Sequence, residues 1–237
     1  MRQGESIQGV VLAGGLGTRL RPWTATLPKV LMEAGGRPFL AHQLQWFARY
    51  GIREVVLCVG YLAEKVEAFA KDGRAFGVRL IYSYEGEKPL GTAGALKKAQ
   101  RFLKESFCVL NGDSYLPINP LEPIRYFRRE DLTALMLTSQ NRNRHDRSNT
   151  AVREGWVVAY DRRRPRSKME FIDYGLRLFR KEVLRLIPRG FSDLDGLYQK
   201  LIEKNQLAAY PVKEPFYEIG GPVGLARFQR YARQARL

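Results

Sequence analysis

The chain has 237 residues, 45% of them hydrophobic and 11% aromatic, and its 40 Lys and Arg against 24 Asp and Glu give a formal net charge of +16. This length suffices for a sizeable hydrophobic core, and the composition excludes intrinsic disorder despite the charge. No apolar run approaches the roughly 18 residues of a membrane span, and the first residues lack a secretory pattern. Cys58 and Cys108 lie inside apolar runs, which predicts buried free thiols. We therefore expect a cytoplasmic protein that does not bind a membrane.

The basic excess is uneven along the chain. Segment 142–168 holds nine Arg and Lys against three acidic residues, a pattern typical of a solvated, arginine-rich connection. The segment lacks the regular interleaving of aromatic residues that base stacking needs, so we do not expect nucleic-acid binding. High positive charge also suits an enzyme whose substrates are polyphosphates.

The first half of the chain alternates strand and helix patterns. Short apolar, β-branched runs predict strands, and amphipathic or Ala- and Leu-rich stretches predict helices. The predicted strands are residues 7–12, 54–59, 78–83 and 107–110, and the predicted helices are 39–50, 62–71 and 92–104. Strand–helix–strand units in this order favour a parallel sheet with helices on both faces.

The second half is less regular. It contains predicted strands at 132–139, 151–153, 156–160, 171–179 and 207–212, and predicted helices at 193–205 and 222–236. Glu154 and Gly155 indicate a hairpin turn, and Ser192 or Asp193 is expected to cap the helix that follows. We expect one α/β domain over residues 1–237, with a nucleotide-binding half (1–118) and a sugar-phosphate-binding half (119–237). Its predicted form is a Rossmann-like three-layer domain with a mostly parallel central sheet and a smaller β insertion in the second half.

Segment 12–29, LAGGLGTRLRPWTATLPK, carries the strongest local signal for chemistry. It follows a predicted buried strand and combines several glycines with Arg19, Arg21 and Lys29. Glycines allow backbone N–H groups to face an anion, and Arg and Lys neutralise phosphate charge. Its spacing differs from the Walker loop and from the dinucleotide-binding fingerprint. The segment therefore predicts a phosphate site of another kind.

This segment resembles the signature of the sugar-1-phosphate nucleotidyltransferases, G-G-x-G-T-R-L-x-P-x-T followed by P-K. The matching residues are Gly14, Gly15, Gly17, Thr18, Arg19, Leu20, Pro22, Thr24, Pro28 and Lys29. The resemblance continues through LGTAGAL (90–96), NGD (111–113), IDYGL (172–176) and EIGGP (218–222). It implies transfer of a nucleoside monophosphate from a nucleoside triphosphate (NTP) to a sugar 1-phosphate. The products are pyrophosphate and a nucleoside diphosphate sugar, and the implied cofactor is Mg²⁺.

The resemblance also implies roles for individual residues. Arg19 on the triphosphate, Lys29 on the reacting phosphates and Asp113 as a Mg²⁺ ligand are implied as catalytic. The implied nucleotide-binding residues are Leu12, Ala13, Gly14, Gly15, Gly17, Thr18, Glu85, Pro89, Gly91 and Thr92, with base contacts near Glu85 and Pro89. Asp173 and Gly175 are implied to line the sugar pocket.

Two positions depart from the pattern of the family. Glu218 stands where the family often has Asp as a second metal ligand, and a glutamate is still a hard oxygen donor that suits Mg²⁺. The family commonly has a lysine on the sugar phosphate, where this chain has Arg162. Arg163 and Lys168 are the alternatives for that role.

The residue types agree with this chemistry. A sugar phosphate is mostly dianionic at pH 7, because its second pKa is about 6, so its attack on an α-phosphorus needs no general base. Catalysis then consists of positioning and charge stabilisation. The two histidines, His42 in a predicted helix and His145 in the charged segment, have no chemical role in this scheme.

Within the family, the pairing of IDYGL with FYEIGGP resembles most the heptose-1-phosphate and mannose-1-phosphate guanylyltransferases of cell-envelope glycan synthesis, so GTP is the favoured NTP. A uridylyltransferase for a hexose or amino-sugar 1-phosphate is the alternative. A non-catalytic, nucleotide-sugar-binding regulatory subunit is the alternative of another class. The nucleobase, the sugar and the oligomeric state, a homo-oligomer included, stay open at this point.

Overall fold

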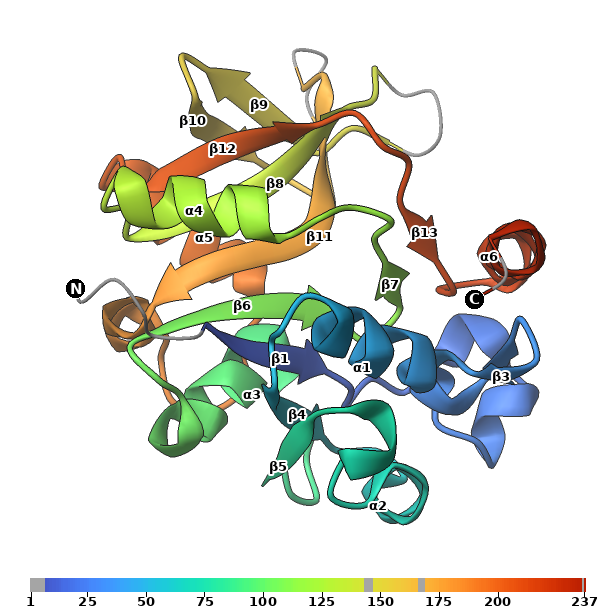
Figure 1. Ribbon diagram of the computed structural model, residues 1–237. Helices are drawn as coiled ribbons and strands as arrows, with labels where there is room; N and C mark the ends of the chain where they lie inside the picture. The colour runs from blue at the N-terminus through green and yellow to red at the C-terminus, as the bar shows by residue number, and fades with distance from the viewer. Residues whose placement is uncertain (1–6, 143–146, 166–168, 236) are drawn as a thin grey trace.

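A nine-stranded sheet forms the centre of the computed structural model, which describes residues 7–142, 147–165, 169–235 and 237. The strand order is β5-β4-β1-β6-β11-β8-β12-β10-β9. In Figure 1 the sheet runs from β5 at the bottom to β9 and β10 at the top. Helices cover both faces, so the expected three-layer α/β architecture is present.

The four strands of the first half are parallel. They are β1 (Gln8–Leu12), β4 (Glu54–Val59), β5 (Arg79–Tyr84) and β6 (Ser106–Asn111). β1 pairs with β4 and β6, and β4 pairs with β5, all in parallel. Parallel strands covered by helices on both faces need apolar side chains on both faces. For this reason β1, β4 and β6 are recognisable by their apolar runs, whereas the edge strand β5 is only partly buried. The carboxyl ends of all four strands meet at one edge of the sheet.

The second half is mixed. Its strands are β8 (Ala134–Gln140), β9 (Thr150–Arg153), β10 (Trp156–Tyr160), β11 (Phe171–Arg180) and β12 (Leu207–Val212). β11 is antiparallel to β6 and β8, β12 is parallel to β8, and β10 is antiparallel to both β12 and β9.

The expectation of a mostly parallel sheet is therefore right for the first half only. Counted over the described strands, four neighbouring pairs are parallel and four are antiparallel. A two-residue connection can join only antiparallel strands, and Glu154 and Gly155, with φ of 50° and 79°, make such a turn between β9 and β10. This hairpin extends the main sheet at its edge and does not form a separate sheet.

Two apolar layers pack against the sheet. The helices α1 (Phe39–Arg49), α2 (Ala63–Ala70) and α4 (Leu121–Arg129) cover one face, and α3 (Gly91–Lys98) and α5 (Leu194–Glu203) cover the other. Helix α6 (Pro222–Gln234) packs against the short strands Tyr217–Glu218 and Glu33–Ala34. Phe39 and Phe127 are fully buried in the first layer, and Phe107 and Phe179 in the second. Full burial of a side chain of this size contributes roughly 2–3 kcal/mol.

Helix α4 has no counterpart among the predicted helices. Pro123 and the arginines of LEPIRYFRR obscure its pattern, although proline is tolerated in the first helical turn. Helix α3 is shorter than the helix predicted at 92–104, because a 3₁₀ helix replaces it at Ala99–Phe102.

Shorter elements complete the chain. β7 (Ser114–Tyr115) pairs with β13 (Tyr217–Glu218), and β2 (Glu33–Ala34) pairs with β3 (Arg37–Pro38). The other 3₁₀ helices are Thr18–Leu20, Trp23–Ala25, Lys29–Leu31, Arg74–Phe76 and Lys181–Leu186.

Several local predictions are tested by the structure. Cys58 and Cys108 are buried and free, and burial raises the pKa of each thiol to about 12. His42 is buried, and its Nε2 donates to the Ala34 carbonyl at 2.6 Å, so its role is structural. None of the helices in the described part of the chain combines the length and the hydropathy that a bilayer crossing requires.

The N-cap residue of α5 is one of the two that the sequence predicts. Asp193 occupies the N-cap position, but its side chain makes no capping hydrogen bond. The Leu194 N–H donates instead to the hydroxyl of Thr92, at 2.9 Å. The start of α5 is thereby tied to α3 and not to its own preceding residues.

Candidate active site

A cavity of about 760 Å³ opens at the carboxyl ends of β1, β5, β6 and β10, the position at which open α/β sheets bind ligands. Both halves of the chain line it. The residues of the predicted site that line it are Leu12, Ala13, Gly14, Gly15, Arg19, Lys29, Glu85, Pro89, Gly91, Thr92, Asp113, Arg162, Asp173 and Glu218. Gly17, Thr18 and Gly175 are not in the lining.

Gly17 and Gly175 act on the shape of the backbone. Gly17, with φ of 62°, starts the 3₁₀ helix that carries Thr18 and Arg19, and its carbonyl accepts from the Thr24 hydroxyl at 2.8 Å. Gly175 has φ of 98° and lies within a register shift of β11 against β8. Both backbone conformations favour glycine.

Two other glycines permit close contacts around the loop after β1. A Cβ atom on Gly14 would lie 1.8 Å from Glu85 Oε1, and one on Gly112 would lie 2.4 Å from the Leu12 carbonyl oxygen. The Gly112 N–H donates to that same carbonyl at 3.1 Å. Larger residues would therefore push apart the segments of the first half that line the cavity.

Lys29 and Asp113 form an ion pair in the cavity. Lys29 Nζ lies 2.6 Å from Asp113 Oδ2, and each side chain is 17% exposed. Burial alone would raise the pKa of the Asp113 carboxyl, but the charge and hydrogen bond of Lys29 and the charge of Arg19 hold that pKa below its ordinary value. Asp113 is therefore ionised at neutral pH, as a metal ligand must be.

Arg19, in segment 12–29, approaches the same carboxylate. The position of a Cβ on Gly220 would lie 2.7 Å from Arg19 Nη2 and 3.5 Å from Asp113 Oδ2. Gly220 thus leaves room for a guanidinium and a carboxylate together. Arg21, two residues further on, does not line the cavity.

Glu218 reaches the site through strand pairing. β13 is antiparallel to β7 with Glu218 opposite Ser114, and the Ile219 N–H donates to the Asp113 carbonyl at 2.9 Å. The two carboxylates therefore come from adjoining strands at the cavity. Within the described ranges no group of three or more His, Cys, Asp and Glu is placed to hold a metal. Two hard carboxylates nevertheless fit Mg²⁺, which binds through one or two carboxylates together with substrate phosphates and water.

Glu85 closes the loop that leads into α3. Its Oε2 accepts the Leu90 N–H at 2.8 Å, and burial raises the pKa of its carboxyl. The next residues in the lining, Pro89 and Gly91, belong to this loop and to the start of α3. Glu85 therefore shapes this wall of the cavity.

The floor of the second half contains a buried ion pair. Asp173 is 8% exposed and Arg177 is 4% exposed, and Arg177 Nη2 donates to Asp173 Oδ2. Burial would lower the pKa of the Arg177 guanidinium, but the charge of Asp173 raises it above its ordinary value. Both residues line the cavity.

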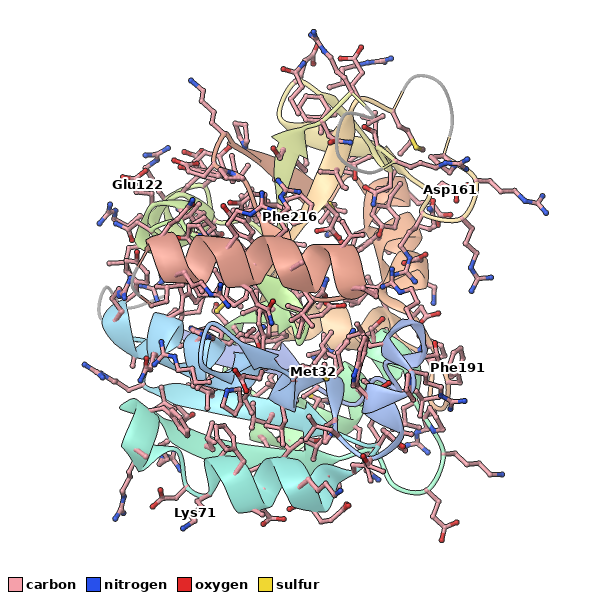
Figure 2. The ribbon with its side chains drawn as sticks, turned by 90° about the vertical axis from the view of Figure 1, so that its right-hand side faces the viewer. Met32, Lys71, Glu122, Asp161, Phe191 and Phe216 are labelled. Carbon is pink, nitrogen blue, oxygen red and sulfur yellow. The ribbon has the colours of Figure 1, made fainter. Side chains whose placement is uncertain are left out.

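The rim of this half is cationic. Arg162 lines the cavity, and Asp161 Oδ1 shapes its turn by accepting the N–H groups of Arg163 and Arg164 at 2.9 and 2.7 Å. Arg163 Nη2 lies 3.9 Å from Asp193 Oδ2, and Arg163 itself does not line the cavity. In Figure 2 the labelled Asp161 lies above the labelled Phe191, on the same side of the view.

Of the three cations weighed for the sugar phosphate, Arg162 is thus the one placed in the lining. Lys168 and His145 lie outside the described residues.

Sequence reasoning missed several lining residues. They are Leu16, Val30, Ala95, Asn111, Gly112, Arg147, Asn149, Tyr160, Ile172, Arg177, Phe191 and Asp193. Asn111 and Gly112 stand beside Asp113 in the NGD segment, and Ile172 belongs to IDYGL, so their neighbours were the available signal. Phe191, 69% exposed, is an apolar side chain at the mouth of the cavity.

The sequence is similar to those of known proteins. Residues 8–148 match the family described as Nucleotidyl transferase. The chain is 32% identical over 232 residues to the Mannose-1-phosphate guanyltransferase of Candida albicans, and the aligned region covers 91% of this chain and 62% of that protein. It is 30% identical over 228 residues to the UTP--glucose-1-phosphate uridylyltransferase of Synechocystis, and this aligned region covers 89% of this chain and 58% of that protein. The chain belongs to the nucleotidyl transferase family, and it spans about three fifths of the length of these relatives.

Solved structures show the same fold. A glucose-1-phosphate thymidylyltransferase structure from Bacillus anthracis superposes with a TM-score of 0.86 at 21% identity, covering 96% of both chains. HddC from Yersinia pseudotuberculosis, complexed with GMP-PN, superposes with a TM-score of 0.78 at 22% identity and covers 95% of this chain and 99% of its own. The expected α/β nucleotidyltransferase fold is therefore confirmed.

Proposed function

We propose that this protein is an enzyme that transfers a nucleoside monophosphate from an NTP to a sugar 1-phosphate and releases pyrophosphate. One observation carries the proposal: Arg19 and Lys29 of segment 12–29 line the same cavity as Asp113 and Glu218, which come from two other segments. Two cations beside two carboxylates at the ends of parallel strands suit polyphosphates bound with a divalent metal.

The residues divide the work by position. Arg19 and the glycine loop bind the triphosphate, and Lys29 binds the phosphates that react. Asp113 and Glu218 would hold Mg²⁺, which supplies charge neutralisation at the phosphates when bound. Arg162 binds the sugar phosphate, and Asp173 contacts the sugar. The reaction then needs no general base, because the attacking phosphate is already anionic at pH 7 and the barrier is the approach of two polyanions.

GTP and a mannose- or heptose-type sugar 1-phosphate are the proposed substrates. Support comes from relatives named Mannose-1-phosphate guanyltransferase in Candida albicans and Saccharomyces cerevisiae, each 32% identical to this chain. The uridylyltransferase name of the Synechocystis relative supports the alternative, UTP with a hexose phosphate. Nucleotide-sugar synthesis for cell-envelope glycans, in the cytoplasm, is the proposed role.

A pyrophosphate-release screen tests the proposal. GTP, UTP, CTP, ATP and dTTP are each combined with a panel of sugar 1-phosphates and Mg²⁺, with Asp113→Ala as the inactive control. We expect GTP with a mannose- or heptose-type 1-phosphate to release pyrophosphate and to form the corresponding nucleoside diphosphate sugar. Release with UTP alone would replace the proposed base, and no release with any pair would overturn the enzymatic proposal.

A further inference from the structure

Arg177 is a buried cation that neither the motifs nor the proposed reaction accounts for. Its Nη1 donates to Asn111 Oδ1 at 2.7 Å and to the Gly175 carbonyl at 3.3 Å, and its Nη2 donates to Asp173 Oδ2. Asn111 and Asp173 both line the cavity. One guanidinium therefore joins the end of β6, next to Asp113, to the floor of the second half.

Arg177 forms hydrogen bonds with residues that line the cavity, but within the described part of the chain it does not satisfy all of its own donors. Among the described residues its Nε finds no hydrogen-bond partner although it is buried. A buried donor without a partner is costly, so a side chain selected only for packing is expected to satisfy it. Here the two terminal nitrogens serve cavity-lining groups while the inner nitrogen stays unsatisfied.

Asp173 is held from several sides. Its Oδ1 accepts the Gly175 N–H at 3.1 Å, its Oδ2 accepts from Arg177, and its own N–H donates to Asn149 Oδ1 at 3.0 Å. An ionised carboxylate accepts about four hydrogen bonds and donates none. Fixed in this way at the cavity floor, Asp173 keeps acceptor positions that only a donor, such as a sugar hydroxyl, satisfies.

Charge makes Arg177 necessary for this role. Under the proposed function the cavity receives a triphosphate and a sugar phosphate, and an uncompensated carboxylate at low dielectric would repel both. The positive charge of Arg177 offsets the negative charge of Asp173. The carboxylate can therefore accept a hydrogen bond from a hydroxyl without repelling a phosphate nearby.

We propose that Arg177 is a positioning residue that fixes and neutralises Asp173 as an acceptor for one hydroxyl of the sugar 1-phosphate. The inference rests on the proposed function and deepens it. The proposal narrows the substrate class to sugar 1-phosphates that carry a free hydroxyl at the ring position facing the Asp173 carboxylate. Analogues that lack or acylate that hydroxyl leave Asp173 unsatisfied and are rejected, because a site built to bond a hydroxyl discriminates strongly against its absence.

The test uses Arg177→Lys, Arg177→Met and the charge-balanced double variant Asp173→Asn with Arg177→Met. Arg180→Met is the matched control: Arg180 lies on the same strand, is paired with Asp131, is 18% exposed and is not in the cavity lining. The probes are the NTP and sugar 1-phosphate that the wild-type protein turns over, and analogues of that sugar phosphate that each lack one hydroxyl. Thermal unfolding reports whether each variant is folded.

We expect Arg177→Lys and Arg177→Met to raise KM for the sugar 1-phosphate by about tenfold to a hundredfold, the usual range for losing a hydrogen bond to a charged group. KM for the NTP should change by less than about twofold, since a positioning effect on one substrate leaves the other unaltered. The double variant should recover part of the loss. One deoxy analogue should be a poor substrate for the wild-type protein, and its disadvantage should shrink in Arg177→Lys.

Several results would overturn the inference. Equal losses for both substrates, unchanged sugar KM, or a deoxy disadvantage that persists in Arg177→Lys would show a purely structural arginine. If Arg177→Met does not fold, Arg177→Lys and the double variant decide by the same criteria. A wild-type protein that releases no pyrophosphate would overturn the proposed function itself, whereas an active protein with unaffected variants would overturn only the role of Arg177.

Discussion

Lys29 Nζ and Asp113 Oδ2 lie 2.6 Å apart, although the two residues belong to different segments of the sheet edge. The contact joins the last residue of the phosphate-loop motif to the carboxylate that follows β6. Lys29 and Arg19 hold the pKa of the Asp113 carboxyl below its ordinary value in a place that is largely shielded from water, so this negative charge is present before any substrate binds. An anion or a cation that enters the cavity therefore meets oppositely charged partners already in position.

Replacing Asp113 should remove turnover. We expect Asp113→Ala to lower kcat by about a thousandfold or more, the scale of losing charge stabilisation at a phosphoryl-transfer centre. Pyrophosphate release measures the rate, and circular dichroism with thermal unfolding checks the fold. Activity within about tenfold of wild type would contradict a metal-ligand role.

Glu218 offers a test by side-chain length against charge. Glu218→Asp keeps a carboxylate and should retain far more activity than Glu218→Gln, which keeps the length but loses the charge that a Mg²⁺ ligand provides. Activity is measured over a titration of Mg²⁺, and the glutamine variant should need much more metal. Equal rates for the two variants would count against metal binding at this position.

Two neighbouring arginines separate a role in the cavity from a general effect of charge. Arg19→Ala should lower kcat/KM by about a hundredfold or more, whereas Arg21→Ala removes the same charge outside the lining and should have a small effect. Steady-state kinetics at fixed ionic strength make the comparison. Similar losses would mean that the loop acts only through its overall positive charge.

Glu85 should make stability depend on pH in a defined direction. Burial raises the pKa of its carboxyl above 4.5, so the folded protein holds this proton to higher pH than the unfolded chain does. The contribution of Glu85 to the free energy of unfolding is therefore largest at low pH and declines as pH rises through these two pKa values. Glu85→Gln retains an acceptor for the Leu90 N–H but does not titrate.

Urea unfolding of both proteins between about pH 3.5 and pH 7 checks this expectation. The glutamine variant should gain stability relative to wild type as pH rises. A difference that is constant across the range, or that changes in the opposite direction, would show that burial does not control this carboxyl.

Local patterns predicted well what local residues determine. The parallel strands of the first half and the Glu154-Gly155 turn each depend on a short stretch of chain, and the structure contains both. The direction of β11 and β8 depends on partners far away in the sequence, so the mixed sheet was not predictable from their apolar runs.

The same distinction applies to the candidate site. Arg19, Lys29 and Asp113 stand in recognisable motifs, whereas Arg147 and Arg177 lie in segments with no motif of their own. Arg177 follows IDYGL within a strand whose other residues are almost all buried and apolar. Its place in the cavity results from the register shift of β11 against β8, a property of the assembled sheet.

The pairing of β7 with β13 has a consequence for the timing of assembly. During synthesis, segment 12–29 leaves the ribosome long before Glu218 does. Domains fold as units, and the strand that carries Glu218 pairs with β7 of the first half, so the candidate site is complete only after Glu218 has been synthesised. Under the proposed function, turnover would begin only once β13 has paired with β7.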